Sequence, residues 1–177
     1  MDAKKTIMGF IKPKLVLVIT LLILFPLTFF GLIMLLCVTI PTFIRAKKNI
    51  AKLEANGELE KAAAEIMSAS AKRLVNGKVI FTENYIFCKG TGFIFTYDEV
   101  LWAYKHRFTR SILFIPIIVT DSLYLATKEQ KPKAIASMGK DKMDEIKNAI
   151  LEIYKHNSKC LIGYTEQNAA SYKVLSK

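Results

Sequence analysis

Residues 76–106 read NGKVIFTENYIFCKGTGFIFTYDEVLWAYKH, and this stretch decides the fold of the second half of the chain. Short runs of β-branched and aromatic residues alternate in it with turn segments that contain Gly, Asn or charged residues. Runs of this kind are typical of antiparallel strands joined by tight connections. The pattern predicts strands at 78–81, 85–88 and 93–96, and then a longer strand over 100–108 in which large and small or charged side chains alternate.

The residues that follow continue the sheet and end in a helix. Segments 111–119, 123–126 and 134–138 each predict a further strand. Asp141 can then cap a helix with one apolar stripe, because its apolar residues recur at spacings of three and four. The stripe consists of Met143, Ile146, Ile150 and Ile153. Strands followed by one amphipathic helix predict an α+β domain: a small antiparallel β-barrel or sandwich of six to seven strands, capped by a C-terminal helix.

The same stretch resembles bacterial pleckstrin-homology-like (PH-like) domains. The likeness lies in a strand pair followed by a Tyr-acidic-aliphatic turn, here residues 97–100, which leads into a long aromatic strand. It covers residues 74–160 and implies the PH-like fold. Eukaryotic members often bind phosphoinositides through basic residues in the first strand loop. That loop is Thr-Glu-Asn at 82–84 in this sequence and lacks the basic pair, so no phosphoinositide site is implied.

The segments on either side of this domain predict helices. Residues 45–73 are rich in Ala, Lys and Glu and predict an amphipathic helical connector, with a turn at Asn56 and Gly57. The connector would lie against headgroups or the domain, or else act as a solvated spacer. In the C-terminal tail, 161–177, Thr165 can cap a short helix. The apolar start of the tail would pack back on the β domain or hold a partner.

The longest apolar segment lies near the N-terminus. Residues 15–44 carry no charged side chain, and they exceed the roughly 20 residues that cross a bilayer. The run has no polar stripe and is too long for a cleaved signal peptide. It predicts a transmembrane anchor behind a basic flank, 1–14, in which Pro26 forms a kink or a re-entrant hairpin. The membrane-flanking basic residues would be Lys12, Lys14, Arg45, Lys47 and Lys48.

Composition narrows the class of partner. The chain has 177 residues and a net charge of +11, which favours anionic lipid headgroups or an acidic protein partner. We do not expect the chain to bind nucleic acid, because its sequence contains no recognisable nucleic-acid-binding motif. The three cysteines form no CxxC motif, although one bridge between Cys88 and Cys160 stays open. Free thiols are ordinary in a reducing compartment, so the cysteines favour a cytoplasmic domain on a single-pass protein of the bacterial cell membrane.

The sequence contains no residue set typical of a catalytic, cofactor or metal site. The two histidines, His106 and His156, have no carboxylate or cysteine at metal-ligand spacing. Cys88 and His106 could meet as nucleophile and base, but a cysteine in a strand is more commonly a small buried hydrophobe. The segment KGTG at 89–92 lacks both the lysine and the serine or threonine of a phosphate-binding loop at the positions that hold phosphate and magnesium. We therefore expect neither an enzyme nor a cofactor.

One basic cluster suggests a contact surface, at the predicted hairpin after residue 104. It consists of Lys105, His106, Arg107 and Arg110. These residues predict a membrane-tethered, non-catalytic interaction module that binds a protein partner or an anionic lipid surface. The alternative hypothesis is an accessory or immunity-type membrane subunit that recognises a transmembrane partner through its anchor helix. An enzyme acting on lipid or cell-wall precursors is the third hypothesis.

Overall fold

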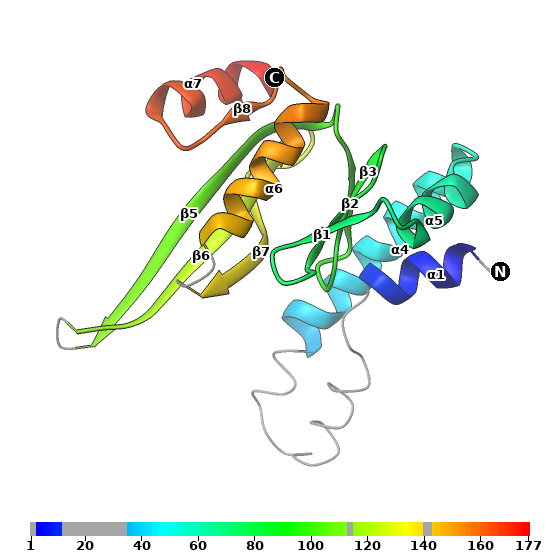
Figure 1. Cartoon of the computed structure of the whole chain (residues 1–177), viewed down its shortest axis with the longest axis horizontal. Coiled ribbons are helices and arrows are strands. Elements are labelled where there is room, and N and C mark those ends of the chain that lie inside the picture. Colours follow the sequence, from blue (N-terminus) through cyan, green and yellow to red (C-terminus); the bar gives the residue numbers. More distant parts are fainter. Residues whose placement is uncertain (1–2, 12–34, 113–114, 140–142) are drawn as a thin grey trace, which may run out of the picture. The chain divides into compact units, whose positions relative to one another are not determined.

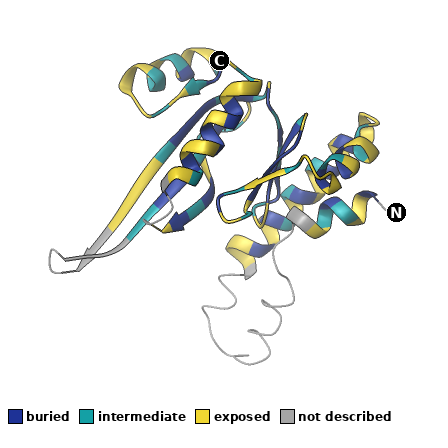
Figure 2. Cartoon of the chain, viewed as in Figure 1, coloured by how far each residue is buried: buried dark blue, intermediate teal, exposed yellow. Residues whose placement is uncertain are grey.

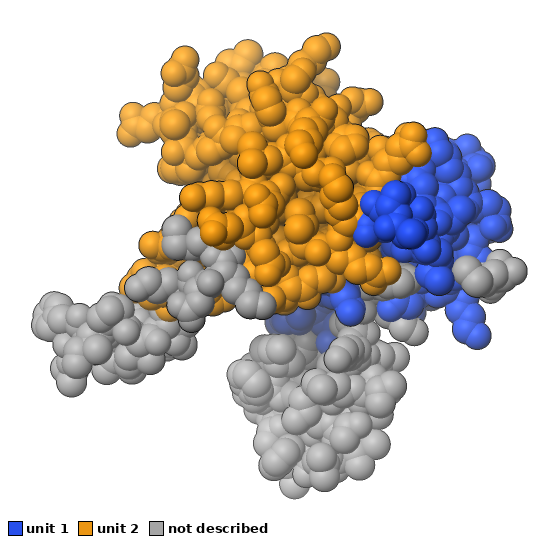
Figure 3. All heavy atoms as spheres, in the orientation of Figure 1, with its two compact units in different colours: residues 1–71, 87–94 blue, residues 72–86, 95–177 orange. Residues whose placement is uncertain are grey.

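The computed structural model places the chain in two compact units, coloured separately in Figure 3. The described residues are 3–11, 35–112, 115–139 and 143–177. Unit 1 consists of Met1–Ala71 and Phe87–Ile94, and unit 2 of Lys72–Ile86 and Phe95–Lys177.

Helices dominate unit 1 (Figure 1). They are α1 (Ala3–Ile11), the π-helical turn η1 (Leu35–Thr39), α4 (Ile40–Ala55) and α5 (Leu59–Met67). Pro41 lies in the first turn of α4, where its missing N–H leaves no helical bond unmade. Gly57 adopts a φ of 72° and reverses the chain between α4 and α5. The inner face of α4 buries Thr42, Ala46, Ile50 and Leu53, whose spacing of three and four gives one stripe.

The predicted transmembrane anchor over 15–44 requires correction. Within the described part of the chain, no helix combines the length and apolar character needed to cross a membrane. Residues 12–34 lie outside the described residues, and 35–44 enter η1 and the start of α4. Because α4 continues past Ile44 through Arg45 and two lysines, it is an amphipathic helix. The finding contradicts both the predicted anchor and the predicted single-pass location in the cell membrane.

Among the described residues, eight strands form two sheets, each with four members. The first sheet has the order β1-β2-β3-β4, with β1 (Lys72–Leu74), β2 (Val79–Phe81), β3 (Tyr85–Cys88) and β4 (Phe93–Thr96). Strand β1 pairs with β2 in antiparallel fashion. It lies at the edge of this sheet, so its outer side has no neighbouring strand among the described residues.

The second sheet has the order β7-β6-β5-β8 and belongs to unit 2. Its strands are β5 (Val100–Ile112), β6 (Ile115–Thr127), β7 (Lys133–Gly139) and β8 (Leu161–Ile162). Helix α6 (Met143–His156) packs on β5 and β6, and α7 (Glu166–Leu175) packs on β5 and β8. The core beneath α6 contains Leu123, Leu125, Ile146, Ala149 and Ile153, all fully buried. In Figure 2, exposed residues follow the outer side of α6 and the more distant part of β5.

The predicted barrel or sandwich is wrong, because the strands form two separate four-stranded sheets. A continuous meander would need β4 to pair with β5. β6 pairs along one side of β5, and on the other side β8 pairs in parallel with Trp102 and Ala103, near the start of the strand. The C-terminal segment therefore takes the position that would have joined the two sheets.

Candidate functional site: a groove beside helix α6

The predicted basic cluster does not form the tip of a hairpin. Lys105, His106, Arg107 and Arg110 all lie within β5. Successive side chains of a strand point to opposite faces, so Lys105 and Arg107 share one face and His106 lies on the other. The side chain of Arg110 lies outside the described side chains. The described members of the cluster are thus divided between two faces of the sheet.

Arg107 is engaged within unit 2 by a buried carboxylate. Its Nε and Nη2 donate to the two oxygens of Asp121, at 2.8 and 2.9 Å. Asp121 lies opposite Arg107 in the β5–β6 register, and its side chain is fully buried. The hydrogen bond from Arg107 lowers the pKa of Asp121 below its usual value, and the charge of Lys105 acts in the same direction. The charge of Arg107 is therefore compensated by a carboxylate within the sheet.

Arg45, predicted to flank a membrane, has a structural role in unit 1. Its Nη1 donates to the carbonyl oxygen of Thr91 at 2.7 Å, and its guanidinium lies 4.1 Å from the ring centre of Phe93. Burial lowers the pKa of Arg45 from its usual value. The Lys47 ammonium lies 4.8 Å from the ring centre of Phe43. Lys48 is exposed, whereas Lys12 and Lys14 lie outside the described residues.

The two histidines make local contacts in unit 2. The His106 ring lies 5.5 Å from that of Tyr124. His156 stacks on Tyr97, with ring centres 4.1 Å apart and planes 10° from parallel, and its Nδ1 is 3.0 Å from the carbonyl oxygen of Glu152. Across the described residues, no three His, Cys, Asp or Glu side chains gather as a metal site would require.

The thiols of Cys88 and Cys160 are free and buried. Burial raises the pKa of Cys88 well above its usual range and that of Cys160 to about 12. Both groups are therefore protonated at neutral pH, whereas a nucleophilic cysteine needs its thiolate. The hypothesis of a Cys88–His106 nucleophile and base gains no support from this environment.

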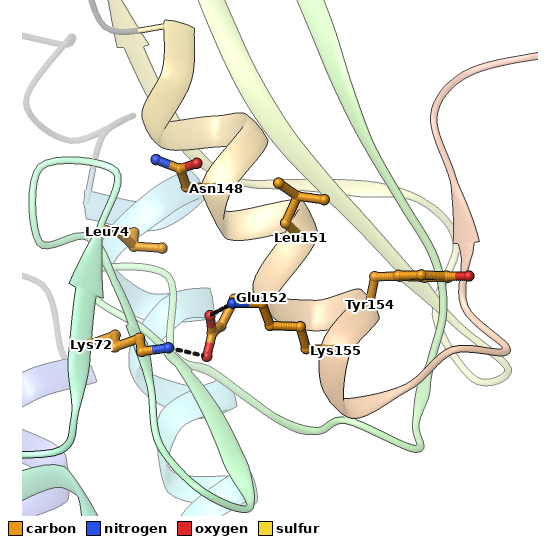
Figure 4. A pocket seen from close by; sticks show the side chains of 7 residues that line it. All are labelled: Lys72, Leu74, Asn148, Leu151, Glu152, Tyr154 and Lys155. Carbon is orange, nitrogen blue, oxygen red and sulfur yellow. Dashed lines mark hydrogen bonds and ion pairs between the residues drawn. The ribbon is translucent and has the colours of Figure 1, made fainter.

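A groove in unit 2 runs from β1 across the outward side of α6 (Figure 4). Its volume is about 310 Å³, near the lower end for ligand sites. It is lined by Lys72 and Leu74 from β1 and by Asn148, Leu151, Glu152, Tyr154 and Lys155 from α6. Sequence reasoning missed this site because it treated residues 72 and 73 as the end of a helix.

A charged triad forms the base of the groove. The ammonium of Lys72 lies 2.7 Å from Oε1 of Glu152, and that of Lys155 lies 3.6 Å from Oε2 (Figure 4). Burial raises the pKa of Glu152, but the hydrogen bond from Lys72 and the charges of Lys72 and Lys155 outweigh it, so the pKa is lowered. The Glu152 side chain is 9% exposed, against 56% and 67% for the two lysines. The negative charge is thus enclosed while the positive charges face solvent.

Apolar side chains form the rest of the groove. Leu151 is 54% exposed and Tyr154 is 47% exposed, although both lie on a helix whose other side supplies core residues. Leu74 on β1 is half-buried. Leu151 and Tyr154 lie outside the predicted apolar stripe of this helix, a signal that was readable in the sequence. Leu74, Leu151 and Tyr154 together give the groove its apolar lining, and β1 is an edge strand among the described residues.

Comparison with known proteins identifies no relative of this chain. No protein-family model matches the chain, and neither does a curated protein or a solved structure. The resemblance to PH-like domains therefore stays a prediction.

Proposed function

We propose that the chain is a non-catalytic interaction module that binds an extended segment of a protein partner in the groove beside α6. One observation carries the proposal: Leu74 of the edge strand β1 and the exposed Leu151 and Tyr154 of α6 line the same groove. Strand addition at a sheet edge supplies affinity through main-chain hydrogen bonds, and neighbouring pockets supply specificity through side chains. Both elements of that mode of recognition are available here.

Affinity in this groove would be modest. Strand β1 has three residues, so it can contribute few main-chain bonds. Fully burying a large apolar side chain stabilises by about 1.5–3 kcal/mol, and Leu151 and Tyr154 are already about half covered. After the entropic cost of association is subtracted, we expect a dissociation constant on the order of 1–100 μM. Such an affinity suits a reversible interaction.

An anionic lipid surface is the other partner class that the sequence predicts. It is supported by the net charge of +11 alone. The groove favours a protein segment, because it combines a strand edge with a shaped apolar lining. The hypothesis of transmembrane-partner recognition depended on the contradicted anchor and is not pursued.

A peptide selection tests the proposal. Random peptides displayed on phage are selected against the full-length chain, and selected peptides are titrated by fluorescence anisotropy against Leu151→Ala and Tyr154→Ala. We expect each substitution to weaken binding about tenfold, because interface residues that become well buried contribute about 1.4 kcal/mol or more. Alanine is a good helix former, so α6 should persist.

Leu175→Ala is the matched control for this selection. Leu175 is 49% exposed, similar to Leu151, but it lies on α7 and does not line the groove. Its substitution should leave peptide binding unchanged. The proposal is overturned if no peptide is selected, or if the selected peptides bind the Leu151→Ala and Tyr154→Ala variants as tightly as the natural chain.

A further inference from the structure

We infer that the segment bound in this groove is acidic, and that it carries a carboxylate placed between Lys72 and Lys155, next to an apolar side chain that contacts Leu151 or Tyr154. This inference rests on the proposed function and specifies the chemistry of its ligand. The observation behind it is an imbalance of charge within the groove. Two ammonium groups and one carboxylate line it, which leaves one formal positive charge uncompensated.

The geometry of the triad decides which charge a ligand would meet. Both oxygens of Glu152 face lysines, Oε1 toward Lys72 and Oε2 toward Lys155. A ligand cation would have to displace one of these lysines and would also be repelled by the other. The carboxylate of Glu152 is therefore poorly suited to recruit a basic segment.

The lysines retain capacity to bind an anion. An ammonium has three hydrogen-bond donors, and Glu152 accepts one from Lys72. The 3.6 Å separation from Lys155 to Glu152 is an ion pair but exceeds the usual length of a hydrogen bond. A ligand carboxylate between the two ammonium groups would complete an alternating pattern of charges. A ligand carboxylate bound there would stay largely hydrated, because both lysine side chains are more than half exposed to solvent.

The carboxylate could come from an Asp or Glu side chain or from the C-terminus of the partner chain. Both sources present the same pair of acceptor oxygens to the lysines. Exposed ion pairs contribute little and are screened by salt. We therefore expect the charge to change affinity by about three- to tenfold at low salt and by less as salt rises.

The test uses groove-dependent peptides from the selection described above, each synthesised in matched versions. One version keeps the Asp and Glu residues, and a second replaces them by Asn and Gln. Each is made with a free C-terminal carboxylate and with a terminal amide. All are titrated by fluorescence anisotropy against the full-length chain, Lys155→Gln and Lys147→Gln. Lys147 is an exposed lysine of the same helix that does not line the groove.

The inference predicts that removing either the side-chain or the terminal carboxylates weakens binding about three- to tenfold, and which of the two does so identifies the source. Lys155→Gln should weaken the acidic peptide by part of this factor, because Lys72 remains, and should leave the neutral version unchanged, and Lys147→Gln should change neither. If groove-dependent peptides bind equally well with and without carboxylates, the acidic preference is wrong while the proposed function stands. If no peptide depends on Leu151 or Tyr154, both fail.

Discussion

Gly92 illustrates how a single residue determines packing within unit 1. It adopts a φ of 73°, and a Cβ at this position would lie 2.5 Å from the carbonyl oxygen of Thr42 and 3.0 Å from the backbone nitrogen of Ala46. The backbone of the turn after β3 therefore lies directly against α4. The side-chain amide of Asn49 donates to the Gly92 carbonyl at 2.8 Å and holds this approach. Only a residue without a side chain meets both requirements.

We predict that Gly92→Ala lowers the free energy of unfolding by about 2–4 kcal/mol, from a left-handed backbone penalty of about 1 kcal/mol and overpacking of about 1–3 kcal/mol. Gly90→Ala is the control, because Gly90 has a φ of 78° but a Cβ added there would meet no atom within 4 Å. It should show the backbone penalty alone. Urea denaturation of both variants measures the difference, and equal losses would contradict the packing described for Gly92.

The β5–β6 hairpin shows what a sequence pattern can and cannot predict at the scale of an element. Alternation predicted the strand that begins at Val100, but residues 111–119 and 123–126 were assigned to two strands, whereas β6 runs unbroken from Ile115 to Thr127. The interruption was Asp121, a charged residue in an apolar stretch. It fits inside the strand because Arg107 neutralises it from β5, and such a partner is visible only once the register is known.

The pairing of these two strands should depend on pH. Because the folded pKa of Asp121 is lowered, its contribution to stability is present above the usual aspartate pKa of about 4 and is lost as pH falls through the folded value. We predict that the natural chain and Asp121→Asn differ most in unfolding free energy near neutral pH and converge on acidification below about pH 4. Urea denaturation across this range measures it. A difference between the natural chain and Asp121→Asn that stays constant with pH would refute the ionised pair.

Short strands explain why the candidate site escaped prediction. Strand β1 has three residues and β8 has two, lengths at which no periodicity can be read. Each is defined by its pairing with a neighbour, β1 with β2 and β8 with β5. Helix α6 was predicted, and Ile146, Ile150 and Ile153 of its predicted apolar stripe are buried, whereas the side chain of Met143 lies outside the described side chains. Leu151 and Tyr154 were visible outside that stripe. The groove could still not be anticipated, because its other wall is β1.

At the scale of the whole molecule, hydropathy was the least reliable guide. The apolar run includes Ile40 to Ile44, yet these residues begin a helix that continues to Ala55 with charged residues on its outer side. The number of apolar residues in a segment indicates how strongly the segment prefers an apolar environment. It does not show where a helix begins or which residues the helix packs against. Arg45 makes the same point, since its charge flanks the run in sequence but contacts Thr91 and Phe93 in unit 1.

The three cysteines report on the integrity of the folded chain. Cys37 is exposed, whereas Cys88 and Cys160 are buried with raised pKa values. We predict that one thiol reacts rapidly with Ellman's reagent under native conditions, because the thiolate is the reactive species, and that the other two react after unfolding in urea. Cys37→Ser should abolish the rapid phase. Rapid reaction of a second thiol without denaturant would contradict the burial of both units' cysteines.

The parallel pairing of β8 with β5 has a consequence for biosynthesis. Leu161 pairs with Trp102, so the strand that covers this edge of β5 is translated long after β5 itself. A ribosome paused between α6 and Leu161 would hold a nascent chain with an open sheet edge and an uncovered indole ring. Open edges recruit strands from other chains and promote aggregation. Protection of this sheet edge on a polysome therefore depends on a segment that is made after the other strands of its sheet.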